Sequence, residues 1–193
     1  MFDPLIRRYT SPLLAAPAER IAALGVSAEA LTVASFVIGL AALPAIGRRA
    51  YLVGLGLMAL SRLIVLAGSA VARLEPPTPF GTYLGIVLDV VWTASVPFAF
   101  ALGQPDRALA AMFLMLGLVA RAAALSAEAK LSRGVGGTAL QFGGTLVGKT
   151  EIFVAFALAC GFADWFSIIA YVLGLVCFVM TGFRVTHAGL QRT

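Results

Sequence analysis

The chain has 193 residues, of which 61% are hydrophobic and 12% are charged. Soluble domains average about 45–50% apolar and about 25% charged residues, so this composition excludes an ordinary soluble domain and indicates an all-α integral membrane protein. The net charge of +5 is explained by membrane topology and contact with anionic lipid, and no nucleic-acid partner is expected. The two cysteines, Cys160 and Cys177, lie in apolar stretches and suggest no disulfide framework.

The first 24 residues are amphipathic. Leu5, Ile6 and Tyr9 share one helical face, while Arg7 and Arg8 point elsewhere. This pattern is typical of a helix that lies in the headgroup plane of a membrane. We therefore predict an interfacial helix at 1–24 and a membrane domain at 25–193, with membrane lipids as partners.

Six apolar stretches follow the amphipathic segment. A helix needs roughly 20 apolar residues to cross the hydrocarbon core. The fifth stretch is short, and we expect it to begin before Thr150. The six predicted transmembrane helices are 28–46, 51–74, 79–103, 108–130, 150–163 and 165–187.

The distribution of Lys and Arg predicts the orientation. With the N-terminus in the cytoplasm, nine of these residues fall in inner segments and three fall in outer loops. The positive-inside rule then places both termini in the cytoplasm. The nine inner residues are Arg7, Arg8, Arg20, Arg73, Lys130, Arg133, Lys149, Arg184 and Arg192.

Residues 61–89 place ionisable side chains inside predicted spans, Arg62 in the second and Asp89 in the third. Such residues mark a functional site by default. The segment contains Ala72-Arg73 and Pro79-Phe80-Gly81 before Asp89. It resembles the motif of the CDP-alcohol phosphatidyltransferase family, Asp-x-x-Asp-Gly-x-x-Ala-Arg followed by Gly-x-x-x-Asp-x-x-x-Asp. The segments 25–27 and 149–151 also resemble the family, before its first span and at the start of its fifth.

The resemblance implies a fold, an activity and a location. The family is expected to have an amphipathic N-terminal helix, six spans and a site that faces the cytoplasm from the inner membrane. Its members transfer a phosphatidyl or phosphoalcohol group from a CDP-linked donor to an alcohol, as in phospholipid biosynthesis. Four aspartates hold two divalent cations, Mg²⁺ or Mn²⁺, which neutralise the charge that develops during transfer. The last aspartate is thought to act as the general base.

Three of the four aspartate positions carry no carboxylate in this chain. We aligned the motif on Ala72 and Arg73 for its first half and on Gly81 for its second half. Ser69 then replaces the motif glycine. The four aspartate positions are occupied, in order, by Val65, Gly68, Gly85 and Asp89.

The metal site is therefore predicted to be degraded. One carboxylate cannot hold two hard cations, which require several oxygen ligands. Glu75 is the only other acid within 61–89, and it lies roughly 10–15 Å along the helix from the level of residues 65–68. We expect that Mg²⁺ or Mn²⁺ is not bound in the family manner.

Arg62 lies one turn before Val65, at the predicted depth of Asp89. We therefore expect Arg62 and Asp89 to pair across the second and third spans. The pair could fix helix register, or Arg62 and Arg73 could form a metal-independent site for a phosphate, or Asp89 could retain catalysis as a base. The candidate residues for nucleotide or phosphate binding are Arg62, Ser69, Ala72, Arg73 and Gly81.

Two classes of function follow from these observations. The first is a transferase, with a CDP-linked lipid or alcohol as its donor and metal-dependent catalysis that is weak or lost. The second is a non-catalytic homologue that binds lipid or nucleotide, or a partner subunit of an active paralogue. A homodimer is compatible with either class.

A second sequence pattern, Gly143-x-x-x-x-Gly148-Lys149-Thr150, matches the phosphate-binding P-loop motif. That motif functions between a strand and a helix of a soluble α/β sheet. Here an apolar span follows, so we interpret residues 134–148 as a Gly-rich cytoplasmic loop. Such a loop could cover a headgroup cavity.

Overall fold

The computed structural model describes residues 20, 23, 25–74, 78–134 and 148–190. Within this part of the chain all regular structure is helical, and no strand occurs. The predicted interfacial helix at 1–24, Glu75 and nearly all of the Gly-rich loop lie outside the described residues. The elements are α2 (Ala28–Gly47), α3 (Tyr51–Val71), α4 (Pro79–Gly103), η1 (Pro105–Arg107), α5 (Ala108–Gly134), α6 (Lys149–Gly161), η2 (Ala163–Trp165) and α7 (Phe166–Leu190).

Five helical segments are long and apolar enough to cross a membrane, which confirms the membrane fold class. They correspond to the first, second, third, fourth and sixth predicted spans. The fifth corresponds to α6, which has 13 residues and is about 20 Å long at 1.5 Å per residue. This is shorter than the roughly 30 Å of a hydrocarbon core. A membrane crossing by α6, which would bring the total to six, therefore stays a prediction, as does the orientation of the termini.

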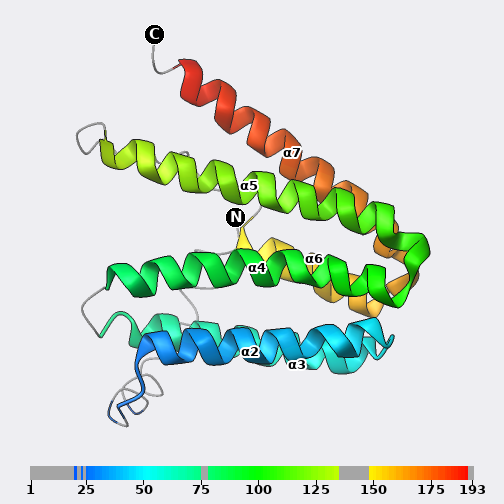
Figure 1. The fold of residues 1–193 in the computed structure, drawn as a ribbon, viewed down its shortest axis with the longest axis horizontal. Helices are drawn as coiled ribbons and strands as arrows, with labels where there is room; N and C mark the ends of the chain where they lie inside the picture. Colours follow the sequence, from blue (N-terminus) through cyan, green and yellow to red (C-terminus); the bar gives the residue numbers. More distant parts are fainter. Residues whose placement is uncertain (1–19, 21–22, 24, 75–77, 135–147, 191–193) are drawn as a thin grey trace.

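Local sequence signals explain where the helices begin. Ser27 caps α2, and its side chain accepts a hydrogen bond from the backbone N–H of Ala30 at 3.2 Å. Thr78 caps α4 in the same way, and Pro79 occupies the first helical position, where its missing N–H costs nothing. At α6, the Glu151 carboxylate accepts from the Gly148 N–H at 2.8 Å. The capped beginnings of α2 and α4 lie at the same end of the bundle (Figure 1).

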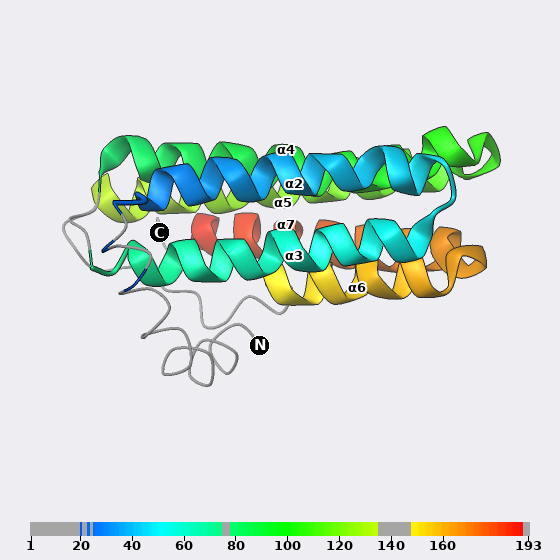
Figure 2. The ribbon, with the colours of Figure 1, turned by 90° about the horizontal axis from the view of Figure 1, so that it is seen from below.

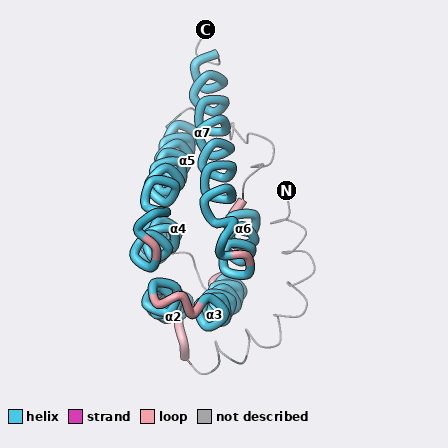
Figure 3. Tube along the Cα trace, turned by 90° about the vertical axis from the view of Figure 1, so that its right-hand side faces the viewer, coloured by secondary structure: helices cyan, strands magenta, loops and turns pink. Residues whose placement is uncertain are grey.

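The long helices run nearly side by side (Figure 1) and form a closed ring of contacts. α2 packs on α3 and α4, α4 packs on α5, and α5 packs on α7, while α6 joins α3 to α7. Figure 3 shows this ring end-on, with α2 and α3 at one edge and α7 at the other. In Figure 2, α6 runs beside only part of α3.

An aromatic cluster packs the interior. Phe100 stacks on Phe166 with ring centroids 4.3 Å apart and on Tyr51 at 5.5 Å. Trp92 meets Phe156 edge-on at 6.2 Å. These contacts tie α4 to α3, α6 and α7 across the interior of the ring.

The outward faces of the helices are apolar. Leu52, Leu109, Phe183 and many other large hydrophobic side chains are exposed on the isolated chain. A soluble monomer rarely exposes such extensive apolar surface. This surface suits contact with lipid, in agreement with the composition.

Candidate functional site

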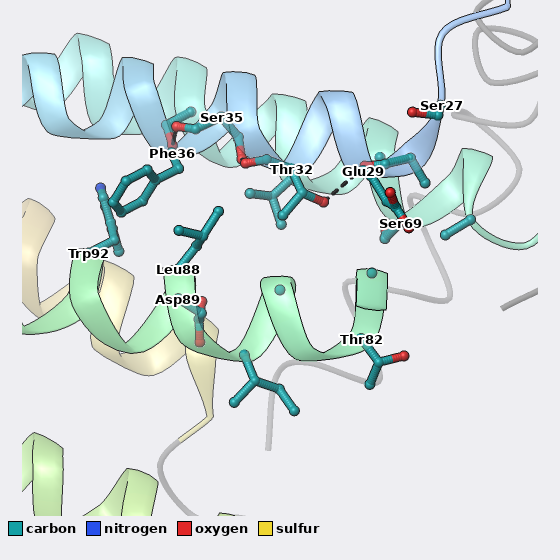
Figure 4. A pocket seen from close by; sticks show the side chains of 18 of the residues that line it. Ser27, Glu29, Thr32, Ser35, Phe36, Ser69, Thr82, Leu88, Asp89 and Trp92 are labelled. Carbon is teal, nitrogen blue, oxygen red and sulfur yellow. Dashed lines mark hydrogen bonds between the residues drawn. The ribbon is translucent and has the colours of Figure 1, made fainter. Parts of the chain in front are cut away.

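A cavity of about 590 Å³ lies between α2, α3, α4 and the start of α6 (Figure 4). Trp92 and Phe36 lie at one end of it, while Glu29, Ser69 and Thr82 lie at the other (Figure 4). Its apolar lining exceeds its polar lining, as is usual for small-molecule sites. Ionisable side chains reach it from all four helices, namely Glu29, Arg62, Asp89 and Lys149.

The motif positions from the two halves of residues 61–89 meet in this cavity. All four aspartate positions line it, and so do four of the five residues predicted to bind nucleotide or phosphate. The exception is Arg73, which is exposed in the turn after α3 and is not part of the lining. The lining residues that were predicted are Arg62, Val65, Gly68, Ser69, Ala72, Gly81, Gly85 and Asp89.

The cavity does not suit two divalent cations. Val65, Gly68 and Gly85 offer no side-chain oxygen, and the described residues contain no group of three His, Cys, Asp or Glu side chains that could hold a metal ion. Space is not the obstacle at Gly85, because a Cβ built there would meet no heavy atom within 4 Å. The donor set therefore disagrees with the metals that the family motif implies.

Asp89 pairs with Lys149, so the predicted pairing with Arg62 is wrong. The Lys149 ammonium lies 3.1 Å from the Asp89 carboxylate, and the two side chains are 54% and 30% exposed. Lys149 is the first residue of α6. The prediction paired Arg62 with Asp89 because the two lie at a similar depth in the second and third spans, and it did not consider a partner from α6.

Arg62 forms no ion pair with a described residue. Its guanidinium carbon lies 6.0 Å from the centroid of the Phe153 ring, at the distance limit for a cation–π contact. Phe153 is on α6, four residues after Lys149, so the two side chains share one face of that helix. Arg62 from α3 and Lys149 from α6 both line the cavity.

Glu29 is a functional candidate that sequence reasoning missed. The Thr78 hydroxyl donates to its carboxylate at 2.5 Å, and the N–H of Gly81 donates to the same hydroxyl at 2.9 Å. A Cβ on Gly81 would lie 2.8 Å from the Thr78 hydroxyl oxygen and 3.0 Å from the Glu29 Oε1 atom, so the absence of a side chain at this motif glycine leaves room for the Thr78–Glu29 contact. In the sequence, Glu29 is an acidic residue in the first turn of α2, a position that the helix dipole alone explains. Its position at the same end of the bundle as Gly81 was the available signal.

Hydroxyl groups and one indole form the deep end of the cavity. The Ser61 hydroxyl donates to the Ser35 carbonyl at 2.7 Å, and the Ser35 hydroxyl donates to the Thr32 carbonyl at 2.7 Å. Trp92 lines the cavity with its ring, and its buried Nε1 has no hydrogen-bond partner among the described residues. That atom lies against Gly39, where an added Cβ would be only 2.3 Å away.

Comparisons with known proteins agree with the membrane fold. The chain is 32% identical to the inner membrane protein YnjF of Escherichia coli (strain K12) over 205 aligned positions, which cover 100% of both chains. Its fold matches the crystal structure of Mycobacterium tuberculosis phosphatidylinositol phosphate synthase (PgsA1) with CDP-DAG bound. The TM-score is 0.74 at 15% identity, with 93% of this chain and 92% of the other covered. No protein-family model matches the sequence.

Proposed function

We propose that this chain, which belongs to the same family as the inner membrane protein YnjF, binds a CDP-linked lipid or alcohol in the cavity between α2, α3 and α4. The fold is that of a CDP-alcohol phosphatidyltransferase, since phosphatidylinositol phosphate synthase shares it. That protein was crystallised with CDP-DAG, which supports a CDP-linked lipid as the ligand class here. We further propose that metal-dependent transfer is weak or lost.

The observation that carries this proposal is the lining of the cavity. Positions that match the family's aspartates line one cavity of ligand size, yet three of them are Val65, Gly68 and Gly85. A cavity with this shape but without metal ligands supports binding more strongly than phosphoryl transfer. Mg²⁺ or Mn²⁺ would have only Asp89 at the motif positions, and Lys149 already neutralises that carboxylate.

Retained catalysis is the second candidate, and Asp89 is the observation that favours it. Asp89 lines the cavity and is 30% exposed, so it could accept a proton from an acceptor hydroxyl. Its ion pair with Lys149 must open before the carboxylate can contact an acceptor hydroxyl, so residual activity should be low. A homodimer, or a heteromer with an active paralogue that supplies the missing ligands, stays a prediction.

The proposed topology is multi-pass, with the cavity facing the cytoplasm from the inner membrane. The cavity residues at the beginnings of α2 and α4 lie at the end of the bundle that also holds Arg73. The other end holds Arg48, Arg49 and Arg107. The count of nine basic residues against three supports the first end as cytoplasmic.

Two assays on the purified protein test the proposal. CDP-diacylglycerol should raise the melting temperature by mass action, whereas diacylglycerol without the nucleotide should not. Release of CMP in the presence of Mn²⁺ and a panel of alcohol acceptors should stay near the background rate. Rapid CMP release would show that transfer is retained, and the absence of stabilisation by CDP-diacylglycerol would exclude the proposed ligand class.

A further inference from the structure

We infer that the Lys149 ammonium and the Arg62 guanidinium form a metal-independent binding site for a phosphate or diphosphate group, in which Lys149 supplies the charge that divalent cations supply in the family. This inference rests on the proposed function, because it assumes that the cavity is the ligand site. It adds the groups that hold the phosphate and the absence of a metal requirement.

The first step concerns the charge on Asp89. This carboxylate lines the cavity and is 30% exposed. It is the one motif carboxylate in place of four, and the Lys149 ammonium lies 3.1 Å from it. A bound phosphate would compete with Asp89 for that ammonium, so the cation that meets the phosphate can be Lys149 and not a divalent metal ion.

The second step concerns Arg62. Its guanidinium has five N–H donors and no acceptor, and it forms no ion pair with the described residues. The contact with Phe153 leaves its donors available to a ligand. A guanidinium beside a cavity of ligand size suits a phosphate, which it can bind through two parallel hydrogen bonds.

The third step concerns the placement of the two cations. Lys149 and Phe153 are one turn apart on α6, and the Arg62 guanidinium reaches the Phe153 ring from α3. Arg62 and Lys149 also line the same cavity. One phosphate-bearing ligand in that cavity can therefore contact both side chains.

The fourth step concerns the rest of the cavity. Ser69, Thr32 and Thr82 add polar surface to its lining. Each hydroxyl donates to a carbonyl of its own helix, so it would have to rotate before it could donate to a phosphate oxygen. Phe36 and Ile86 supply apolar surface in the same lining. A ligand with a charged phosphate and an apolar tail fits this combination.

The test is a binding titration in EDTA with CDP-diacylglycerol, phosphatidic acid and soluble CDP. Wild-type protein should bind CDP-diacylglycerol equally well in EDTA and in Mn²⁺. Lys149→Gln and Arg62→Gln should each weaken metal-free binding about tenfold or more, because each removes a charge-assisted contact. Arg48→Gln, an exposed arginine at the other end of α2, should leave affinity unchanged. Lys149→Arg retains the charge and should retain most of the affinity, which separates loss of charge from misfolding.

Asp89→Asn gives the sharpest comparison. If the Lys149 ammonium binds the phosphate, this variant should bind the ligand in EDTA as tightly as wild type or more tightly. The substitution removes the Asp89 carboxylate, which competes with the phosphate for Lys149. Binding that requires Mn²⁺ and disappears in Asp89→Asn would overturn the inference while leaving the proposed ligand intact. No binding of any phosphate ligand under either condition would overturn both. Preference for phosphatidic acid or for CDP would identify which part of the ligand supplies the shared phosphate.

Discussion

At the scale of single residues, Gly39 shows how closely α2 and α4 approach. The Trp92 Nε1 atom would lie 2.3 Å from a Cβ at this position. Because Trp92 also packs against Phe156, its ring cannot move away without disturbing the core. The absence of a side chain at Gly39 is therefore a packing requirement at the deep end of the cavity.

Gly39→Ala should destabilise the protein by about 1–3 kcal/mol, the usual cost of forcing extra volume into a packed core. The free energy of unfolding in detergent is the measurement. Gly56→Ala is the matched control, since a Cβ there would meet no atom within 4 Å. The control should be neutral or more stable by up to about 1 kcal/mol, because alanine favours helix. Equal stability of the two variants would contradict this account of Gly39.

Asp89→Asn should change stability by less than about 1 kcal/mol. The variant breaks the ion pair with Lys149, but both side chains are partly exposed, and solvent screens pairs of this kind. The unfolding free energy of the ligand-free variant is the measurement. A loss of several kcal/mol would indicate a buried ion pair with a different partner, such as the Arg62 pairing that the structure does not contain.

At the scale of elements, arginine side chains join the short connections at the end of the bundle away from the cavity. Arg49 donates to the Gly103 carbonyl at 3.3 Å, and it adopts a left-handed φ of 63° in the turn between α2 and α3. Arg107 in η1 donates to the Ala163 carbonyl and to the Asp164 carboxylate in η2. These contacts fix the relative positions of α4, α5 and α7 where the chain reverses.

Arg107→Gln should destabilise the protein by about 1–2 kcal/mol. The side chain is only 13% exposed, and its loss leaves the Ala163 carbonyl without this donor. Asp164→Asn is the control, because the Asp164 side chain is 97% exposed and an exposed ion pair contributes little. Thermal melting of the two variants side by side checks the ranking. A larger effect of Asp164→Asn would show that the charge pair dominates over the backbone hydrogen bond.

The elements and most of the cavity were predictable from sequence, for physical reasons. Apolar stretches of about 20 residues have few alternatives to spanning helices, and five of them appear with nearly the predicted ends. The motif spacing placed Val65, Gly68, Gly85 and Asp89 on facing helices, and the structure brings them together. Contacts with distant segments were missed. Lys149 reaches Asp89 from α6, so a comparison of depth along α3 and α4 could not reveal it.

At the scale of the whole molecule, the fold matches that of phosphatidylinositol phosphate synthase, and the proposed loss of the metal site is explained by three positions in the cavity. If only the side chains at three positions have removed the metal site, then restoring them should recover it. Val65→Asp, Gly68→Asp and Gly85→Asp together would give four carboxylates with Asp89. Gly85 has room for the change, whereas a Cβ on Gly68 would approach the Leu31 Cβ to 3.2 Å.

The triple aspartate variant should acquire stabilisation by Mn²⁺ that wild type lacks. At a Mn²⁺ concentration ten times the dissociation constant, the expected gain is about 1.4 kcal/mol in unfolding free energy. The corresponding triple asparagine variant has similar volume without the charge and should not respond. Equal Mn²⁺ stabilisation of wild type and of the aspartate variant would mean that a metal site already exists outside the motif positions.

The most direct test of the central claim is the melting temperature of the wild-type protein with CDP-diacylglycerol, measured in EDTA and again in Mn²⁺. The account predicts stabilisation of equal size under both conditions, because Arg62 and Lys149 replace the metal at the phosphate. Stabilisation that appears only with Mn²⁺ would contradict it and would show that the cavity still binds its ligand through a metal ion.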